Sequence, residues 1–304
     1  MDISVVVPTL NGRERLSTCL DALDDHVPDA EVVVVNGPSA DGTTGMVRER
    51  DDVSALIEVS DRNLNVARNA GIAEATGDVV ALVGHDVVVE ESWRDGVVEA
   101  MDDGVAAVTG PVHRAVRAGM TTEDRETRTI AGREVTYFAG ENVAFERETL
   151  ERVDGFDENL LTGGARDCAH RLTHQGFSVS WSSDVCVEST DDGEGVDRDW
   201  GVKYHALSYR LVKNYGPRLT VFRRTLQDAV DDGTSVARKV VAGDAQPSSW
   251  INSGKHVLRN IATGTRDGVR ARVEDRTDAR NPAGLSSRAD RAVERYDWRE
   301  DEQR

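Results

Sequence analysis

Residues 78–86, Asp78-Val79-Val80-Ala81-Leu82-Val83-Gly84-His85-Asp86, form the stretch that decides the expected fold. An apolar run stops at Gly84, and the carboxylate of Asp86 follows two positions later. The run predicts a central strand that is buried on both faces of a sheet. Open α/β sheets bind ligands beyond the carboxyl ends of their strands, so Asp86 is placed to contact a metal, a phosphate or a ribose. The alternative is that residues 84–86 form only a turn after a core strand.

The segments before this strand alternate between strands and helices. Apolar runs predict strands at 3–8, 31–35 and 54–60, and Pro8 closes the first because it cannot donate to a ladder. Apolar residues at helical spacing predict a helix after the first strand, and further helices are expected near 43–50 and 66–76. This succession of β–loop–α units predicts a parallel sheet with right-handed crossovers.

The chain after Asp86 gives a weaker pattern. We expect a helix at 91–102, a strand at 105–109, a short helix after 145, and strands at 177–181 and 185–187. Residues 110–140 are expected to be a polar loop region, and residues 190–199 an acidic linker. Long polar loops over the mouth of a sheet are where acceptors bind and lids move.

The charge balance limits the possible partners. The 304 residues contain 37 Lys+Arg and 55 Asp+Glu, which gives a net charge of −18. General nucleic-acid binding is excluded at that charge. Only Lys203, Lys213, Lys239 and Lys255 are lysines, and an acidic, lysine-poor chain is typical of a salt-accumulating halophile. The excess acid is therefore expected to keep the surface hydrated.

The cysteines and the apolar segments bear on the compartment. Cys19, Cys168 and Cys186 have no metal-site spacing in the sequence, and their odd number argues for a reducing compartment. We expect no signal peptide, because the chain starts with a strand-like segment, and no apolar run approaches the ~20 residues that a spanning helix needs. The expected location is the cytoplasm or the cytoplasmic face of the cell membrane.

Five short motifs follow one another within residues 1–190. They are Val5-Val6-Val7-Pro8-Thr9-Leu10-Asn11, Val33-Val34-Val35-Asn36-Gly37-Pro38-Ser39-Ala40-Asp41-Gly42-Thr43, Ala67-Arg68-Asn69-Ala70-Gly71-Ile72, Gly77-Asp78, and Gly84-His85-Asp86. Together they resemble the family 2 glycosyltransferases, in particular haloarchaeal enzymes of lipid-linked N-glycan assembly. The resemblance implies the GT-A fold, a Rossmann-like and mostly parallel sheet with flanking helices, and a site for a nucleoside-diphosphate sugar.

The resemblance also assigns the donor site. Thr9 and Asn11 would lie beside the base and ribose. Asn36 stands where the family usually has an aspartate that contacts the base, and its amide can still accept from an N–H. Arg68 would line the pyrophosphate side, where a guanidinium matches phosphate oxygens. For Arg68 the alternative is an ordinary surface salt bridge.

The opening stretch corresponds to the family's D-x-D motif, with Gly84 in place of the first aspartate. The resemblance implies that Asp86 holds a divalent metal, Mg²⁺ or Mn²⁺, together with the donor phosphates. His85 is either a second ligand or a packed or solvent-facing histidine. Ser189 stands where the family often has a histidine ligand, and Glu188 beside it would point to the other face of the strand.

The catalytic candidate is Asp167, which matches the aspartate of the family's E-D pair, with Arg166 in place of the glutamate. The resemblance implies that this aspartate is the general base that takes a proton from the acceptor hydroxyl in an inverting transfer. A glycosidase would need a pair of carboxylates instead. The alternative for Asp167 is a helix-capping residue after two glycines.

The composition changes sign after the linker. Residues 200–224 contain no Asp or Glu and six Lys/Arg, with apolar residues at helical spacing. This stretch either contacts an anionic membrane or lipid phosphate, or packs back on the catalytic domain. We expect a glycosyltransferase domain at 1–190, a basic helical extension at 200–272 with a helix near 250–272, and a charged, mobile tail at 273–304.

These observations lead to one expected function and two alternatives. We expect an inverting, metal-assisted transfer of a sugar from a nucleoside-diphosphate donor, most simply UDP-linked, to a dolichyl- or polyprenyl-phosphate-linked glycan. A sugar-phosphate nucleotidylyltransferase would need a richer phosphate loop than Asn11-Gly12-Arg13. A non-catalytic nucleotide-sugar or glycan-binding scaffold is the second alternative, because Gly84, Arg166 and Ser189 depart from the family.

Overall fold

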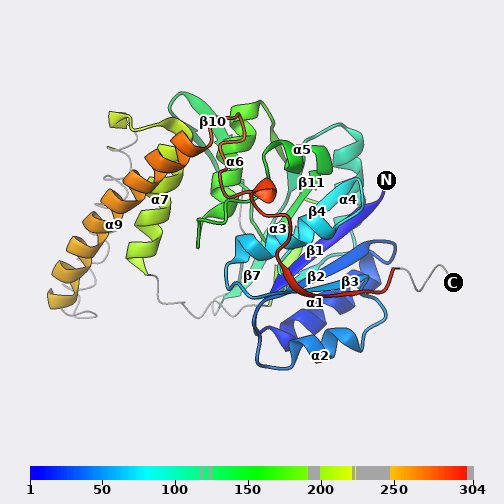
Figure 1. The fold of residues 1–304 in the computed structure, drawn as a ribbon. Helices are drawn as coiled ribbons and strands as arrows, with labels where there is room; N and C mark the ends of the chain where they lie inside the picture. Colours follow the sequence, from blue (N-terminus) through cyan, green and yellow to red (C-terminus); the bar gives the residue numbers. More distant parts are fainter. Residues whose placement is uncertain (117–118, 123–124, 191–198, 221–222, 224–246, 300–304) are drawn as a thin grey trace.

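The structure, a computed structural model, describes residues 1–116, 119–122, 125–190, 199–220, 223 and 247–299 (Figure 1). Its centre is an eight-stranded sheet with the order β12-β6-β11-β4-β1-β2-β3-β14. The first four strands in the chain pair in parallel, in the order β4-β1-β2-β3. These strands are β1 (Ile3–Thr9), β2 (Glu31–Asn36), β3 (Ala55–Val59) and β4 (Val79–Val83). The expected α/β fold is therefore confirmed.

The remaining strands of the large sheet extend both of its edges. β11 (Asn142–Glu146) pairs antiparallel with β4 and with β6 (Ala107–Thr109), and β12 (Val179–Trp181) closes that edge in parallel with β6. At the other edge β14 (Ala292–Asp297) pairs antiparallel with β3. Because the central strands are parallel, the carboxyl ends of β1, β2 and β4 lie next to one another.

Helices cover both faces of the large sheet. One core lies between the sheet and the helices α1 (Arg13–His26) and α4 (Trp93–Asp102). The other core lies against α3 (Leu64–Glu74), α6 (Gly164–Gln175) and α7 (Trp200–Tyr215). Val5 and Val6 belong to opposite cores, as the alternation of side chains along a strand requires. Two short helices, α2 (Thr43–Arg48) and α5 (Arg147–Arg152), complete this part of the fold.

Residues 110–140 are not the polar loop that the sequence predicts. They contain β7 (Val112–Val116), β8 (Gly119–Thr122) and a hairpin of β9 (Thr127–Ile130) and β10 (Arg133–Thr136). β7 and β8 join β5 (Val87–Val89) and β13 (Val187–Ser189) in a small four-stranded sheet, with the order β5-β13-β7-β8. The strands are short and rich in polar residues, so their apolar signal is weak, and backbone pairing with distant segments makes them strands.

The first helix of the C-terminal extension packs on the core that contains α3 and α6. α7 lies along α9 (Pro247–Glu274). The α7 residues Tyr204, Leu207, Leu211 and Val212 belong to the same core as the apolar residues of α6. For residues 200–215 the structure thus favours packing over a membrane-facing apolar side. Residues 221–222 and 224 of the proposed contact stretch lie outside the described residues. Among the described helices, none combines the length and the apolar character needed to cross a membrane.

The segment 273–304, which the sequence predicts to be a mobile tail, contains a paired strand and ion pairs in its described part, residues 273–299. β14 adds the eighth strand of the large sheet, and Arg291 forms a buried ion pair with Glu158. Most side chains of β14 are exposed, so the strand has no apolar pattern that sequence analysis could detect. Backbone pairing and ion pairs such as Arg299 with Glu31 hold it in place. Residues 300–304 lie outside the described residues.

The close packing of α3 on the sheet gives a test of the fold. A Cβ on Gly71 would overlap the Val6 side chain and lie 3.0 Å from Val35 Cγ2. We expect Gly71→Ala to lower the free energy of unfolding by about 1–3 kcal/mol, because α3 must move away from β1 and β2. The measurement is chemical denaturation at the salt concentration in which the protein is folded.

Gly45→Ala in α2 is the matched control. A Cβ there meets no atom within 4 Å, and Gly45 is exposed. Alanine favours a helix over glycine by ~1 kcal/mol, so this change should leave the free energy of unfolding equal or slightly higher. Equal losses in both variants would contradict the close approach of α3 to the sheet.

Candidate active site

Three predicted donor-site residues meet at the ends of β1 and β2. Thr9 and Asn36 are register partners at the last position of these strands. The Ser39 hydroxyl joins Asn36 to Asn11: it donates to Asn36 Oδ1 at 2.7 Å and accepts from the Asn11 backbone N–H at 2.8 Å. The Asn11 side chain also accepts from the backbone N–H of Ala40 at 2.8 Å. The turns after the two strands therefore form one polar rim.

The hydroxyl of Thr9 is a buried hydrogen-bonding group of this rim. Thr9 is 5% exposed, and its Oγ1 has no hydrogen-bond partner among the described residues. A Cβ on Gly12 would lie 2.9 Å from that oxygen and would overlap the ring of His85. His85 therefore packs against Gly12, as one of the two sequence interpretations proposed. This contact brings the turn after β4 next to the turn after β1.

Asp86 lies in the turn between β4 and β5. Its backbone oxygen accepts from the Thr190 N–H at 2.8 Å and from the Thr190 hydroxyl at 2.9 Å, so the backbone is fixed from the end of β13. The side chain is half-buried, and within the described part of the chain no side chain pairs with its carboxylate. Asp86 thus has a fixed backbone and a carboxylate that can bind a ligand.

Glu141 occupies the space beside the glycine that replaces the first aspartate of the D-x-D motif. A Cβ on Gly84 would lie 2.8 Å from Glu141 Cβ and 2.9 Å from Asp86 Oδ1. Both contacts are closer than real Cβ atoms allow, so Gly84 is required by its neighbours. Glu141 brings a second carboxylate to the same place, and sequence analysis did not single it out.

Arg114 of β7 ties this carboxylate to Ser189. Its Nη2 donates to Glu141 Oε1 at 2.6 Å, and its Nη1 donates to Ser189 Oγ at 3.2 Å. Ser189 is 5% exposed and Glu188 beside it is exposed, which confirms that the two side chains point to opposite faces of β13. The Ser189 hydroxyl, at the position where the resemblance expects a histidine ligand, thus accepts from a cation. No local signal in the sequence marks Arg114.

The residues around Asp86 fit a divalent cation that binds together with an anionic substrate. Mg²⁺ is commonly held by one or two carboxylates, with phosphate oxygens and waters as the other ligands. Asp86 meets this requirement, whereas Ser189 does not add a free ligand because it accepts from Arg114. The donor set therefore suits an ion that enters with a diphosphate rather than a preformed protein cage.

Arg68 of α3 is a buried cation at the same side of the sheet. Its Nη2 donates to Gly140 O at 2.8 Å and its Nη1 to Asn65 Oδ1 at 3.3 Å, while Nε has no partner among the described residues. Burial lowers the pKa of Arg68 to about 10, so it is charged at neutral pH. The surface salt bridge considered from the sequence is not found, since Arg68 is 6% exposed. Gly140 places it next to Glu141.

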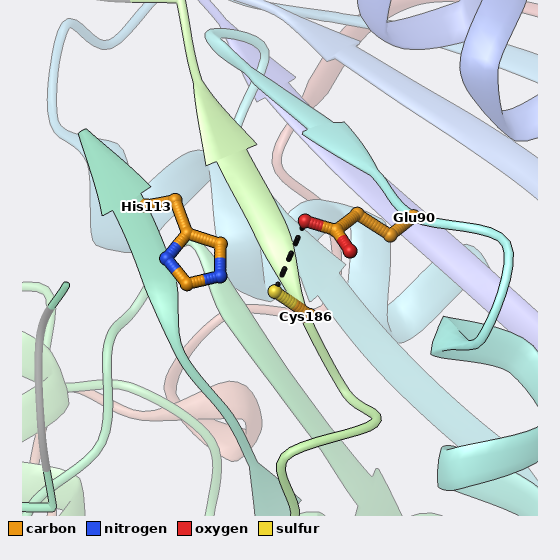
Figure 2. A group of neighbouring side chains, drawn as sticks. All are labelled: Glu90, His113 and Cys186. Atoms are coloured by element: carbon orange, nitrogen blue, oxygen red, sulfur yellow. Dashed lines mark hydrogen bonds between the residues drawn. The ribbon is translucent and has the colours of Figure 1, made fainter. Parts of the chain in front are cut away.

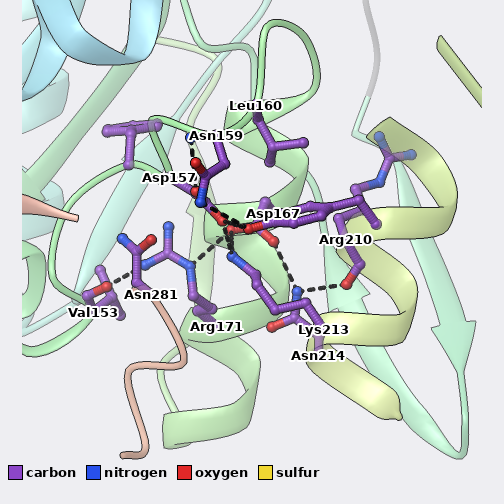
Figure 3. A network of polar contacts seen from close by, with 12 residues as sticks. Val153, Asp157, Asn159, Leu160, Asp167, Arg171, Arg210, Lys213, Asn214 and Asn281 are labelled. Carbon is purple, nitrogen blue, oxygen red and sulfur yellow. Dashed lines mark hydrogen bonds and ion pairs between the residues drawn. The ribbon is translucent and has the colours of Figure 1, made fainter. Parts of the chain in front are cut away.

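Asp167 is the fourth residue of α6. It is fully buried, and its carboxylate accepts from Arg171 Nε at 2.9 Å, Lys213 Nζ at 2.7 Å and Asn214 Nδ2 at 2.8 Å (Figure 3). Burial alone would raise the pKa of Asp167, but the charges of Lys213 and Arg171 outweigh it and hold that pKa well below its usual range. The helix N-cap is Gly163, so Asp167 is not the capping residue considered from the sequence.

Lys213 and Asp157 complete the buried network around Asp167, and sequence analysis missed both. Lys213 Nζ also donates to Asp157 Oδ2 at 2.6 Å (Figure 3). The Tyr209 hydroxyl donates to the same oxygen at 2.8 Å. One signal was present: Lys213 follows Tyr209 by four positions, on the apolar side of a predicted helix. A lysine at such a position is either a break in the stripe or a buried partner of acids.

A cavity next to Asn214, a member of this network, is lined by basic side chains. It has a volume of about 260 Å³. The residues that line it include no carboxylate and are Ala131, Arg133, His174, Asn214, Tyr215, Arg218, Arg272 and Arg280. Asn214 links it to Asp167, because its amide donates to Asp167 and its backbone oxygen accepts from Arg272 Nη1 at 3.1 Å. Burial first, and then the charges of neighbouring arginines, lower the pKa of His174 to about 4.

Size alone does not locate the active site. A larger cavity, of about 790 Å³, is lined by Glu31, Val53 and Ser54 among others, at the opposite ends of β2 and β3. It lies away from the polar rim formed by Thr9, Asn36 and Asp86. The chemistry of the strand ends is therefore a better guide than volume.

Comparison with known proteins identifies glycosyltransferases as similar proteins. The chain is 29% identical over 218 residues to the glycosyltransferase AglE of Haloferax volcanii, which covers 66% of this chain and 71% of AglE. It is 26% identical to the glucosyl-dolichyl phosphate glucuronosyltransferase of the same organism, over 69% of this chain and 71% of the relative. The fold resembles that of the mannosyltransferase PcManGT from Pyrobaculum calidifontis, solved with GDP-Man and Mn²⁺, with a TM-score of 0.55, 19% identity, and coverage of 90% of this chain and 88% of that one.

The match to a family confirms the resemblance inferred from the five motifs, and with it the GT-A fold. The family model described as "Glycosyl transferase family 2" matches residues 4–161, which is more than half of the 304 residues. The matched part contains the rim residues Thr9, Asn36 and Asp86. The chain belongs to glycosyl transferase family 2.

Proposed function

We propose that this protein transfers a sugar, with inversion, from a nucleoside-diphosphate sugar to a hydroxyl group of a lipid-linked glycan. One observation carries the proposal: Thr9, Asn36 and Asp86 lie at the ends of β1, β2 and β4, at one edge of the sheet. That edge is where open α/β sheets bind their ligands. Family membership and the dolichyl phosphate in the name of one relative support the reaction class.

The nucleoside would bind at the polar rim. Asn36 and Asn11 are held by Ser39, so their amides keep a fixed orientation toward a base. Thr9 Oγ1 has no protein partner among the described residues, and a ribose hydroxyl would satisfy it. An unsatisfied buried hydroxyl costs about 1–3 kcal/mol, which a bound ligand would recover.

The diphosphate would be held between Asp86 and Arg68. Arg68 is charged and buried, with an unpartnered Nε, and a guanidinium matches phosphate oxygens. Asp86 would hold Mg²⁺ or Mn²⁺ together with the phosphates, as the Mn²⁺ in the PcManGT structure suggests. When bound, the ion neutralises the charge of the departing diphosphate.

The acceptor phosphate would occupy the arginine cavity. Four arginines and no carboxylate line it in a chain with a net charge of −18, so it suits a dianion such as a lipid phosphate. This proposal also changes the way in which the basic residues of 200–224 would act. Arg218 would contact the phosphate group at the cytoplasmic face of a membrane, while the apolar side of α7 stays in the core.

The general base is assigned to Asp167 by the resemblance alone, and this role stays a prediction. A carboxylate with three donors and a depressed pKa is a weak proton acceptor. Its contacts favour a positioning role, in which Asp167 holds α6 to α7.

A second candidate function follows from the same observation. A protein that lacks a free base and keeps Asp86 and Arg68 would bind a nucleotide sugar without turning it over. Binding of UDP or GDP with Mn²⁺, without product from a panel of nucleotide sugars and lipid-linked glycans, would favour this scaffold function.

Asp86 gives the first test of the proposed transfer. We expect Asp86→Asn to reduce product formation by about 100-fold or more, because the charge opposite the diphosphate is lost. Mn²⁺-dependent binding of UDP or GDP, measured by calorimetry in high salt, should be lost as well. The thermal midpoint should stay unchanged, since no described side chain pairs with the carboxylate.

Asp51→Asn removes one exposed carboxylate far from the rim and serves as the control. It should bind and transfer like the wild type. If Asp86→Asn also keeps wild-type transfer and Mn²⁺-dependent binding, then Asp86 is not part of the donor site.

The two roles of Asp167 predict different outcomes for Asp167→Asn. In the positioning role, the change should lower the free energy of unfolding by about 3–5 kcal/mol, because Lys213 and Arg171 lose a buried counter-charge. The depressed pKa means that this stabilisation is complete above the unfolded value of ~3.9 and is lost as the pH falls below it. The difference between variant and wild type should therefore shrink below about pH 4.

Lys213→Met should destabilise by a similar amount, whereas Lys203→Met on the same helix should change the free energy by less than about 1 kcal/mol. Chemical denaturation measures all three variants. An Asp167→Asn protein of wild-type stability that forms no product would instead identify Asp167 as the base.

The arginine cavity gives the test of the acceptor. We expect the double variant Arg133→Gln/Arg218→Gln to raise KM for a polyprenyl-phosphate-linked acceptor at least about 10-fold, because charge-assisted hydrogen bonds are each worth ~1.5–3 kcal/mol. The affinity for the nucleotide donor should not change. Arg259→Gln/Arg266→Gln removes two exposed charges from α9 as a matched control. An equal rise of KM in both double variants would assign the effect to net charge and not to the cavity.

A further inference from the structure

Glu90, His113 and Cys186 meet on the small sheet, away from the donor site (Figure 2). One possible ligand atom of each residue lies within 4.8 Å of the corresponding atoms of the other two. Glu90 directly follows β5, His113 belongs to β7, and Cys186 directly precedes β13. Three adjacent strands therefore each supply one side chain, although Glu90 and Cys186 are 96 positions apart in the sequence.

We propose that these three side chains bind one thiophilic transition-metal ion, with Zn²⁺ as the natural occupant, and that the ion cross-links the strands. Thiolate, imidazole and carboxylate are the three ligand types that Zn²⁺ takes in proteins. Three protein ligands and one water complete a tetrahedral site. Bond lengths of ~2.0–2.3 Å place the ligand atoms of such a site ~3.3–3.8 Å apart. Cys186 Sγ and Glu90 Oε1 are already 3.2 Å apart, so closure needs only a small movement of side chains.

The imidazole of His113 is oriented for this role. Its Nδ1 lies 2.8 Å from the hydroxyl of Thr122 on β8. When Nδ1 carries the proton and donates it to that hydroxyl, Nε2 presents its lone pair. Figure 2 shows the other ring nitrogen on the side of the Cys186 sulfur. Metal-binding histidines characteristically donate their second N–H to an oxygen in this way.

The thiol of Cys186 is protonated in the metal-free protein. Burial first, and then the hydrogen bond to Glu90, raise the pKa of Cys186 to about 12. The thiol donates to Glu90 Oε1 in this state. Metal binding would replace the sulfur–proton bond by a sulfur–metal bond, and the proton would leave to solvent. Glu90 Oε1, which accepts that proton's hydrogen bond in the metal-free protein, would then coordinate the metal. The ion thus supplies the positive charge that two neighbouring anions require.

The position of the cluster gives the ion a structural consequence. His113 is adjacent in sequence to Arg114, and consecutive strand residues point to opposite faces. Arg114 contacts Ser189 and Glu141, beside Asp86. An ion on one face would therefore fix the strands that carry the candidate active site on the other face. This inference does not depend on which sugar is transferred, or on whether any is.

Co²⁺ titration of the full chain in high salt, after treatment with a chelator, tests the site. A thiolate ligand gives Co²⁺ an intense near-ultraviolet charge-transfer band, which carboxylates on the acidic surface do not. We expect the band to saturate at one Co²⁺ per chain and to disappear when one equivalent of Zn²⁺ is added. Cys186→Ser should abolish it, and Thr122→Val should lower the affinity for Co²⁺ at least about 10-fold.

The chain offers matched controls. Cys168→Ser and Cys19→Ser each remove a buried free thiol outside the cluster and should keep the band. Asp86→Asn should also keep it, which separates this site from the donor site. Circular dichroism establishes that Cys186→Ser is folded, and His113→Gln, which leaves the thiol in place, should weaken binding independently. The proposal is overturned if the wild type shows no band at one equivalent, or if the band persists in Cys186→Ser.

Discussion

The ion pairs of Lys213 connect α7, in the C-terminal extension, to α6 and to the loop that carries Asp157. Its ammonium group lies 2.6 Å from a carboxylate oxygen of Asp157 and 2.7 Å from one of Asp167, and all three side chains are fully buried. An ammonium or carboxylate in the interior is very costly without a partner, so none of the three can leave the cluster alone. Since Lys213 belongs to α7 and Asp167 to α6, the C-terminal extension is joined to the catalytic domain.

Several other contacts join the C-terminal region to the rest of the fold. The apolar residues of α7, the helix that carries Lys213, lie in the same core as those of α6, and α9 packs along α7. The chain after α9 returns to the large sheet, where Asn281 donates to Asp154 O at 2.7 Å and β14 pairs with β3. A sequence that looks like a domain followed by a separate extension therefore forms one connected body in its described parts.

The central fold could be predicted because its signals are local. Val79–Val83 and the valines of β1 and β2 are continuous apolar runs, and parallel strands bring their carboxyl ends together. The resemblance places Thr9 and Asn36 at the donor site, and the register of β1 and β2 brings them together there. The strands β7 to β10 and β14 could not be found, because they are short and polar and depend on pairing with distant segments. For the site, the same limit applies: Arg114, Glu141 and Lys213 contribute through contacts with residues that lie far away in the sequence.

Gly84 and Ser189, where the resemblance implies an aspartate and a histidine, are linked by one series of contacts through Glu141 and Arg114. Without a side chain at Gly84, Glu141 can approach the turn after β4, and its carboxylate attracts Arg114. Arg114 then donates to Ser189, whose small hydroxyl leaves room for the guanidinium. Restoring a carboxylate at position 84 alone would force it against Glu141, so each of these residues is compatible only with the others. An Arg–Glu pair therefore occupies the place where the resemblance expects a second acidic ligand and a histidine, and Asp86 stays the proposed residue for holding a metal together with a diphosphate.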